Sequence, residues 1–296
     1  MKAPEAQPAF ETMGSSAYGY EAHHYLSETM EVTQYHCHDY FEFYIHRRGG
    51  QFMGVDNMIY TLRPWQFFIL PPFSMHGLSC REKMINYERA FLNVTPEVLN
   101  RLGCGQVDLV SLFRNNAACG RYTYQLGEEK GRQFISLLDQ IQARSGNAAD
   151  SMSRFQDYVQ MGAALQLICQ MMGEAVPVES ERLSNSVIQD VLLYINTHYT
   201  EQIHIADLAR TFNVSPSYLA HEFSNFTNRS VYDYVLYRRI MLSRQQMLGD
   251  ASLNTIAYQC GFNDYSNFLR SFTKLVGMSP RAYRKQLQTL QGRESP

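Results

Sequence analysis

The stretch Gly261-Phe262-Asn263-Asp264-Tyr265-Ser266-Asn267-Phe268-Leu269-Arg270-Ser271-Phe272 predicts a tight turn followed by a capped helix. We expect Gly261 to adopt a positive φ in the turn, and Asp264 to cap the helix that begins after it. Phe268 and Phe272 are four residues apart, so they share the buried face of that helix. The stretch therefore predicts the second half of a helix-turn-helix.

The same arrangement occurs about 48 to 49 residues earlier in the chain. Residues 205–212 predict a short helix, residues 213–214 a turn, and Pro216 the first residue of a second helix. Ser215 suits the cap because its hydroxyl accepts an amide hydrogen bond, and proline lacks the amide that would stay unpaired. Ser230 opens a long helix between the two copies. Two helix-turn-helices held by one rigid helix suit successive faces of the DNA major groove, about 34 Å apart.

Composition and charge indicate a folded protein of about two domains, of which the second is the more basic. Hydrophobic residues make up 45% of the 296 residues and charged residues 18%, which suffices for folded cores in about two domains. Residues 1–180 carry fourteen basic and nineteen acidic side chains, whereas residues 181–296 carry twelve and nine, as expected for a nucleic-acid-binding tail. The N-terminus has no apolar run, no stretch has the length of a membrane span, and the six cysteines are scattered. These features predict a cytoplasmic protein with reduced thiols.

The C-terminal motif continues as Gly261-Phe262-x-Asp264-Tyr265-Ser266-Asn267-Phe268-x-Arg270-x-Phe272-x-Lys274-x-x-Gly277-x-Ser279-Pro280-x-x-Tyr283-Arg284. It resembles the signature of the AraC/XylS family of bacterial transcription regulators, over about 100 residues from 187 to 288. The resemblance implies a DNA-binding unit of two helix-turn-helices joined by one helix. It also implies double-stranded operator DNA and RNA polymerase as partners, with activation of transcription favoured over repression.

The resemblance assigns candidate DNA contacts by position. In the second reading helix, Asn267 is expected to bond adenine, and Arg270 guanine or phosphate. In the first, Ala220 offers only an apolar contact, and His221 stands where the family often has arginine. Basic side chains further along suit phosphates, which position the domain without reading sequence. The candidate DNA-binding residues are Ser217, Ala220, His221, Tyr265, Ser266, Asn267, Arg270, Lys274, Arg281 and Arg284.

The N-terminal half has a different periodicity. Residues from about 30 to 125 are rich in Phe, Tyr, Ile and Val, and turn residues such as Gly49-Gly50 and Pro71-Pro72 recur at short intervals. This pattern predicts a small antiparallel barrel or sandwich. Within it, His36, His38 and Glu42 are separated by even numbers of residues, so they point to one face of a strand.

This spacing, with a later histidine at His76, resembles the cupin fold, in which three imidazoles and a carboxylate hold a divalent metal in a small barrel. The sequence departs from the cupin pattern at Trp65 and Phe73, where glycine is usual, and at Cys80, where asparagine is usual. AraC-like regulators commonly keep the histidine–glutamate strand and use the barrel to hold a small effector.

Three interpretations of the histidine–glutamate group stay open: a metal site, the polar lining of an effector pocket, and a hydrogen-bonded structural cluster. We expect effector lining without a resident cofactor. Aromatic faces beside carboxylates and histidines suit a sugar, although the same aromatic residues can simply pack the core. The candidate effector-binding residues are His36, His38, Glu42, Tyr44, His76 and Arg89; further candidates are Tyr35, Tyr40, Tyr60, Trp65, Tyr87 and Glu88.

Beyond residue 125 the apolar period changes from two to 3.6, which predicts helices. One stripe contains Phe134, Leu138 and Ile141, and a second contains Phe155 and Val159. Such stripes either pack against the barrel or form an antiparallel dimer contact. The expected organisation is an arm at 1–25, a cupin-like effector-binding domain at 26–125, a helical dimerisation segment at 126–175, a linker at 176–184 and a DNA-binding domain at 185–290.

We therefore expect an α+β protein of two domains: a cupin-like β-barrel with accessory helices, and an all-α tandem helix-turn-helix. Its expected function is that of a sequence-specific transcription regulator, a homodimer and not an enzyme, controlled by a small molecule, with a carbohydrate favoured. The alternative is a metal-dependent cupin enzyme or metal sensor that uses His36, His38, Glu42 and His76. The sequence has no nucleophile elbow, phosphate-binding glycine loop, CxxC pair or HExxH motif.

Overall fold

The computed structural model describes residues 10–11, 18–30, 35–56, 58–79, 84–144, 150–174, 186–247 and 249–292. The chain divides into two compact units. The sheet unit runs from Glu11 to Glu181, and the helical unit comprises Arg182–Pro296 with Met1–Phe10. The expected linker at 176–184, part of the expected arm and Cys80 lie outside the described residues. No helix in the described ranges is long and apolar enough to cross a membrane.

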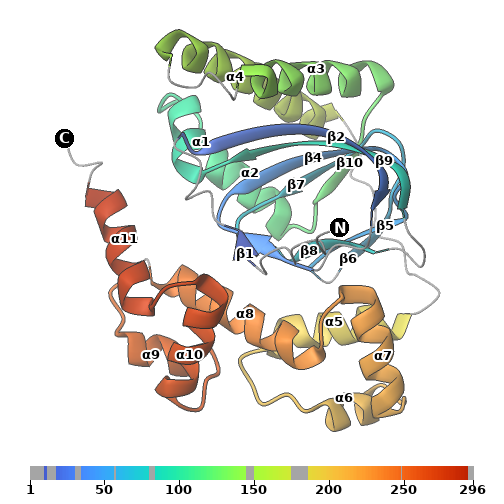
Figure 1. The fold of residues 1–296 in the computed structure, drawn as a ribbon, viewed down its shortest axis with the longest axis vertical. Helices are drawn as coiled ribbons and strands as arrows, with labels where there is room; N and C mark the ends of the chain where they lie inside the picture. The colour runs from blue at the N-terminus through green and yellow to red at the C-terminus, as the bar shows by residue number, and fades with distance from the viewer. Residues whose placement is uncertain are drawn as a thin grey trace, which may run out of the picture. The chain divides into compact units, whose positions relative to one another are not determined.

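The sheet unit contains two antiparallel sheets and a short strand pair (Figure 1). The larger sheet has the order β10-β7-β4-β9-β2, built from Thr123–Gln125, Gln66–Leu70, Phe41–Arg48, Met84–Val94 and Tyr20–Met30. The smaller sheet has the order β6-β5-β8, built from Met58–Thr61, Phe52–Val55 and His76–Ser79. Strands β1 (Phe10–Glu11) and β3 (Cys37–His38) pair separately. Among the described strands, no pairing closes these sheets into a barrel.

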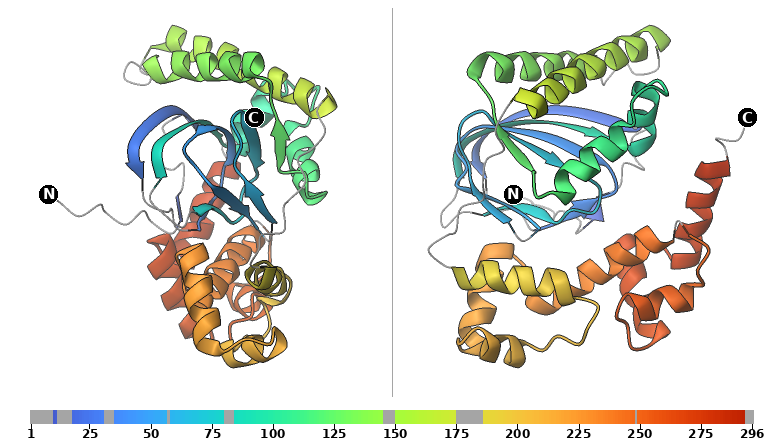
Figure 2. Two further views of the ribbon diagram at one scale, coloured as in Figure 1. Left: turned by 90° about the vertical axis from the view of Figure 1, so that its right-hand side faces the viewer. Right: turned by 180° about the vertical axis from the view of Figure 1, so that it is seen from behind.

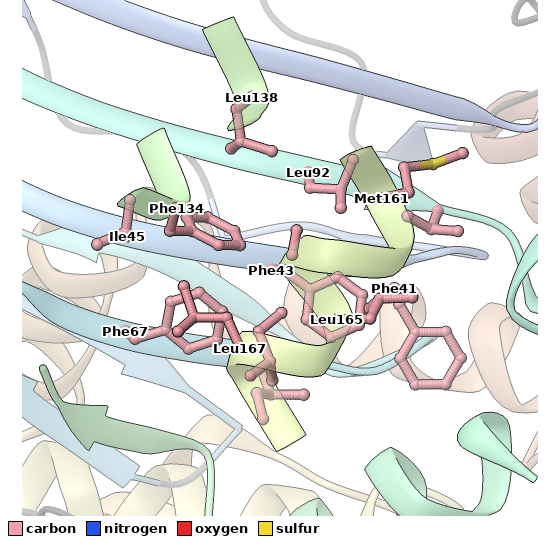
Figure 3. Close-up of a cluster of buried hydrophobic side chains, with 14 of the residues drawn as sticks. Phe41, Phe43, Ile45, Phe67, Leu92, Phe134, Leu138, Met161, Leu165 and Leu167 are labelled. Atoms are coloured by element: carbon pink, nitrogen blue, oxygen red, sulfur yellow. The ribbon is translucent and has the colours of Figure 1, made fainter. Parts of the chain in front are cut away.

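Alternation along β4 divides the unit into two cores, because successive side chains of a strand point to opposite faces. Phe41, Phe43 and Ile45 join the core beneath the helices, part of which Figure 3 shows. Tyr44 joins a second core, whose other members come from both sheets and include Met53, Val55, Tyr60, Phe68 and Tyr87. Of the three residues expected on one strand, Glu42 lies in β4 on the face of Tyr44, whereas His38 belongs to β3 and His36 forms an isolated bridge, so the single strand predicted for them is wrong.

Four helices cover the other face of the larger sheet: α1 (Pro96–Leu102), α2 (Leu109–Ala118), α3 (Glu128–Arg144) and α4 (Ser151–Glu174). Figure 2 shows α3 and α4 lying across this face. The Phe134 stripe of α3 is buried in the core, whereas Phe155 and Val159 of α4 are 64% and 53% exposed. The two helical stripes therefore differ: the first packs against the sheet, and the second turns two of its large apolar residues to solvent.

Strand β2 begins at Tyr20, inside the segment 1–25 that was expected to be an arm. It pairs with β9 along its length, from Tyr20 opposite Val94 to Met30 opposite Met84. Tyr20 and Ala22 are buried under the helices. This strand extends the sheet to a fifth member and brings residues before position 26 beside the sensor candidates.

The helical unit consists of α5 (Ser186–His198), α6 (Ile205–Thr211), α7 (Pro216–Thr227), α8 (Val231–Gln246), α9 (Leu253–Gln259), α10 (Tyr265–Val276) and α11 (Pro280–Gly292). Helices α6 and α7 pack together, as do α9 and α10, and α8 contacts both pairs (Figure 1). This is the expected pair of helix-turn-helices joined by one long helix. Gly261 has φ +86°, and a Cβ there would lie 2.4 Å from the Thr200 carbonyl oxygen, so this turn requires glycine.

Candidate functional site

The first reading helix, α7, is held by its caps and by one buried face. Ser215 Oγ accepts a hydrogen bond from the Tyr218 amide at 3.1 Å, as expected for an N-cap. Leu219 and Phe223 are fully buried, so the helix cannot rotate about its axis without breaking the core. Three candidate residues are exposed on the remaining surface: Ser217, Ala220 and His221.

The second reading helix, α10, is built in the same way. Asp264 Oδ1 accepts from the Asn267 amide at 2.7 Å, which confirms the expected cap. Phe268 and Phe272 are fully buried. The candidates Ser266, Arg270 and Lys274 are exposed, and Tyr265 and Asn267 are half-buried. Both helices therefore present the side that the family motif assigns to DNA.

Several basic candidates keep their charge free of carboxylates. Arg270, Lys274 and Arg281 are exposed and take part in no ion pair between described residues; the ion pair described in this unit joins Arg210 to Asp207. Arg284 differs, because its Nη2 donates to the Ala251 carbonyl oxygen at 2.7 Å. This bond ties α11 to the loop before α9.

His221 has a partner on its own helix. Asn225 Nδ2 lies 3.0 Å from His221 Nε2, one turn further along. With Nε2 accepting this bond, Nδ1 is the donor that remains for other contacts. His221 stands at the place where α10 has Arg270.

Two arginines of α8 that the DNA-binding motif does not include fix the helical unit internally. Arg239 donates through Nε and Nη2 to the carbonyl oxygens of Tyr199 and Glu201, both at 2.6 Å. Arg244 is 1% exposed, and its Nη2 donates to the Tyr283 hydroxyl at 2.8 Å. The middle of α8 is therefore bonded to the segment after α5, and its last turn to α11.

In the sheet unit, three of the four predicted metal or effector ligands converge. One potential ligand atom from each of His38, Glu42 and His76 lies within 4.8 Å of the others. Glu42 Oε2 is 3.0 Å from His38 Nε2 and 3.4 Å from His76 Nε2. Each imidazole Nδ1 bonds a backbone carbonyl, that of Tyr40 at 2.8 Å and that of Ser74 at 3.0 Å. Because a carbonyl only accepts, both Nδ1 atoms carry protons, and both Nε2 atoms face the carboxylate.

The charges in this group support one another. Burial alone would raise the pKa of Glu42, but hydrogen bonding to His38 and the charges of both histidines hold it below its usual range. Burial alone would lower the pKa of His76, but the adjacent Glu42 carboxylate raises it. His76 Nε2 is buried and lacks the geometry of a hydrogen bond.

The fourth predicted ligand, His36, lies beside this group. Its ring centroid is 4.5 Å from that of His76, and the two residues exchange backbone hydrogen bonds at 2.9 Å. It contributes no atom to the cluster of three.

Trp65 and Phe73, which stand where the cupin pattern has glycine, have a backbone conformation that glycine favours. Trp65 and Phe73 have φ values of +65° and +70°, in the left-handed region that favours glycine. The turns at these positions therefore have the conformation that a glycine motif would give, although larger side chains occupy them.

The remaining polar candidates form a second group on the same face of the sheet. The hydroxyls of Tyr44 and Tyr87 are hydrogen-bonded, and burial raises the pKa of both, so both stay protonated. Arg89 lies 4.8 Å from the centroid of the Tyr87 ring, and its Nη1 donates to Ser27 Oγ at 3.2 Å. Glu88 points the other way and pairs with Arg48 at 2.8 Å. The other aromatic candidates, Tyr35, Tyr40, Tyr60 and Trp65, are buried.

Beside Arg89 lies an aromatic shelf, formed by His23, Tyr25 and Phe91, that sequence reasoning missed. Tyr25 is 40% exposed and stacks on His23 with ring centroids 5.3 Å apart, and Phe91 lies 5.2 Å from His23. The register places Tyr25 opposite Arg89, and Phe91 opposite Tyr44, so the shelf shares the face of the sensor candidates. The alternation in Tyr20-Glu21-Ala22-His23-His24-Tyr25 was the available signal, but these residues were assigned to an arm.

Comparison with known proteins bears on the helical unit. Residues 208–286 match a family described as Helix-turn-helix domain. This segment therefore matches a helix-turn-helix domain and includes helices α7 to α10. The chain is 32% identical over 103 residues to the uncharacterized HTH-type transcriptional regulator YdiP of Escherichia coli (strain K12), covering 34% of each protein. It is 30% identical over 107 residues to an uncharacterized HTH-type transcriptional regulator in the cgkA 5'region of Pseudoalteromonas carrageenovora, covering 36% of this chain and 64% of that protein.

Among solved structures, a transcriptional regulator (AraC-type DNA-binding domain-containing proteins) from Chromobacterium violaceum is 22% identical. The match covers 35% of this chain and 94% of that one, with a TM-score of 0.33. The aligned segments span between about a third and two thirds of the length of the two curated relatives. The likeness thus concerns the DNA-binding domain, and relatives that share it are named HTH-type transcriptional regulators.

Proposed function

We propose that the chain is a sequence-specific transcription regulator that binds operator DNA through α7 and α10. The observation that carries this proposal is the paired construction of the two helices, each capped, buried on a phenylalanine face and open on the opposite face. Asn267 and Arg270 would read base edges, and Lys274 and Arg281 would contact phosphates. Arg284 would act mainly by fixing the loop before α9. Tyr265, Ser266, Ser217, Ala220 and His221 complete the contact surface.

Selection from a random duplex library tests this proposal directly. We expect the purified full chain to enrich one sequence motif, and the double variant Arg270→Ala/Lys274→Ala to lose at least tenfold in affinity for it. Arg114→Ala, on α2 of the sheet unit, is the matched loss of an exposed arginine and should bind like the parent. No enrichment, or equal loss in the control, would contradict the proposal.

We further infer that the sheet unit is a cupin-like sensor whose face away from the helices binds a small molecule, with a carbohydrate favoured. The aromatic shelf supports this inference, since exposed rings stack on the C–H faces of sugars. Arg89, Glu42 and Tyr44 supply polar groups on the same face. A thermal-shift screen of sugars and small organic acids should find a ligand that raises the melting temperature. Tyr25→Ala and Arg89→Gln should remove that shift, whereas Arg114→Gln should keep it.

A metal at His38, Glu42 and His76 is the second candidate for the sensor function. The residues fit one: Nε2 of His76 is buried without a hydrogen bond, and both Nδ1 atoms bond backbone carbonyls, as those of metal-bound histidines usually do. Two imidazoles and a carboxylate suit zinc, iron or manganese. Equilibrium dialysis against each metal should then give one equivalent per chain, lost on His38→Ala and kept on His23→Ala. Binding below one tenth of an equivalent would leave the cluster a structural one.

The remaining expectations concern the assembled regulator. We propose that segment 126–175 also mediates homodimerisation, because α4 has apolar residues on its outward side as well as on its buried side. Contact with RNA polymerase, activation of transcription and a cytoplasmic location complete the proposal. Light scattering with and without ligand tests the dimer: a chain that stays monomeric at micromolar concentration on its DNA motif would contradict it.

A further inference from the structure

The sheet unit has a hollow of about 630 Å³ where the start of β2, the end of α1 and the start of α4 meet. Sites for small molecules usually have about 300–1,000 Å³. The hollow lies on the helix-covered side of the sheet, since Tyr20, which lines it, belongs to the core beneath the helices. It is therefore separate from the aromatic shelf, whose residues lie on the opposite face.

The walls of this hollow are aromatic. Tyr18, Tyr20 and Tyr158 contact one another, with ring centroids 6.3 Å apart for the first two and 6.0 Å apart for the last two. Phe155 and Val159 complete the wall from α4, although both are more than half exposed. Large apolar side chains left open beside a hollow commonly mark a binding surface.

Two cations stand at the same hollow. Arg101, at the end of α1, and Arg154, in the first turns of α4, are both exposed and take part in no ion pair between described residues. The Arg154 guanidinium lies 5.4 Å from the centroid of the Tyr18 ring, a cation–π contact that favours its position over the wall. A guanidinium offers paired N–H donors that match a carboxylate.

The acids nearby are already engaged within the protein. Asp157, beneath the hollow, is 3% exposed and accepts hydrogen bonds from the Tyr20 hydroxyl at 2.8 Å and from Arg144 Nε at 2.6 Å. Asp150 accepts from the Met152 and Ser153 amides at the start of α4. The charge of Asp157 is thus compensated, and that of Asp150 is directed to the helix end, so the two arginines favour an anion in the hollow.

We propose that this hollow binds an aromatic carboxylic acid, with its ring against the tyrosine and phenylalanine walls and its carboxylate at Arg101 and Arg154. This site is additional to the sensor face and does not depend on the DNA-binding role. A ligand here would contact both β2 and α4, the outermost strand of the large sheet and the longest helix of the unit.

Isothermal titration of the full chain with 2-naphthoate and with its neutral amide, 2-naphthamide, tests the proposal. We expect saturable binding of the acid, and at least tenfold weaker binding of the amide. Arg101→Gln and Arg154→Gln should each weaken binding of the acid about tenfold, and Val159→Trp should abolish it by filling the hollow. Arg114→Gln, the matched control on α2, should bind like the parent. Thermal unfolding of each variant checks that it is folded.

Three outcomes would overturn the assignment. Equal affinity for the acid and the amide would show that Arg101 and Arg154 do not bind the carboxylate. Loss of binding in Arg89→Gln but not in Arg154→Gln would place the acid on the sensor face, which would leave the proposed sensor intact and refute this site. Absence of binding in the parent chain, together with its conversion from dimer to monomer by Phe155→Ser, would assign the surface to a second copy.

Discussion

The two reading helices share one scaffold but differ in charge. Counting from their caps, Ser215 matches Asp264, Phe223 matches Phe272, and both helices end at a left-handed residue, Asn228 or Gly277. On the open face, however, His221 stands opposite Arg270 in this alignment, and Asn225 opposite Lys274. Helix α10 therefore carries two cations that form no ion pair with another described residue, where α7 carries a hydrogen-bonded histidine–asparagine pair.

This difference separates the residues that determine the fold of the helix from the residues that determine the charge of its exposed face. Caps and buried phenylalanines determine that the helix forms and which face is open, while the open face can vary without affecting the fold. We therefore expect α10 to supply most of the electrostatic affinity for DNA, and α7 to contribute contacts of shape and of neutral hydrogen bonds.

The largest effect should come from the shared scaffold. Phe223→Ala and Phe272→Ala each remove a fully buried ring and should lower the free energy of unfolding of the helical unit by about 3–5 kcal/mol. Urea unfolding followed by far-UV circular dichroism measures both. Leu269→Ala, at a 38% exposed position of α10, should cost far less. If one phenylalanine were dispensable, the two helices would not share one scaffold.

The second largest effect should come from substituting the equivalent positions Arg270 of α10 and His221 of α7, which should affect DNA binding to different extents. Arg270→Ala should weaken binding to the selected DNA motif by about 1–3 kcal/mol and relax base preference at one position. His221→Ala should cost less, and His221→Arg should strengthen binding by adding a charge to α7. Gel shifts against single-base variants of the motif give these values. An equal loss of DNA affinity in Arg270→Ala and His221→Ala would contradict the proposal that α10 contributes more to the affinity than α7.

The caps should have a smaller and equal effect. Ser215→Ala and Asp264→Ala each leave a helix N-terminus without its side-chain acceptor, at a cost of about 1 kcal/mol in unfolding. Ser215→Asp and Asp264→Ser, which exchange the two caps, should stay within about 0.5 kcal/mol of the parent. The same urea transitions report both pairs. A cap that tolerated alanine without loss of stability would show that its side-chain hydrogen bond does not hold the helix end.

The smallest effect concerns the salt dependence of DNA binding. Lys274→Ala should reduce the slope of log K against log salt concentration by about 0.9, the value for one phosphate contact. Asn225→Lys, at the matching position of α7, should steepen the slope by a similar amount. Fluorescence anisotropy at several salt concentrations measures both slopes. An unchanged slope in Lys274→Ala would remove this residue from the phosphate contacts.

The sequence predicted the helical unit well because its determinants are local. Ser215 and Asp264 act on amides three residues away, and the spacing of Phe268 and Phe272 specifies the buried face without reference to the rest of the chain. The hydrogen bonds of Arg239 and Arg244 could not be predicted, because their partners lie about 40 residues away in sequence.

The sensor face was predicted only in part because it depends on strand pairing. Parity predicted that His38 and Glu42 lie together, although they belong to the separate strands β3 and β4, whereas the contact of Arg89 with Tyr25 requires the register of β2 on β9. This strand was not predicted, because residues 1–25 were assigned to an arm. The left-handed turns at Trp65 and Phe73 were not predicted either, since bulky residues rarely adopt the backbone conformation that glycine favours.

The bonds from the middle and the last turn of α8 have a mechanical consequence. Arg239 fastens this helix to the segment after α5, and Arg244 fastens it to α11, so the pieces that carry α7 and α10 are braced against swivelling. A protein braced in this way cannot stretch to fit half-sites set one base pair too far apart. The duplex would then have to deform to bring the half-sites to the required spacing. The stiffness of the base steps between the half-sites would therefore influence which promoters the protein occupies, even though no side chain contacts those steps.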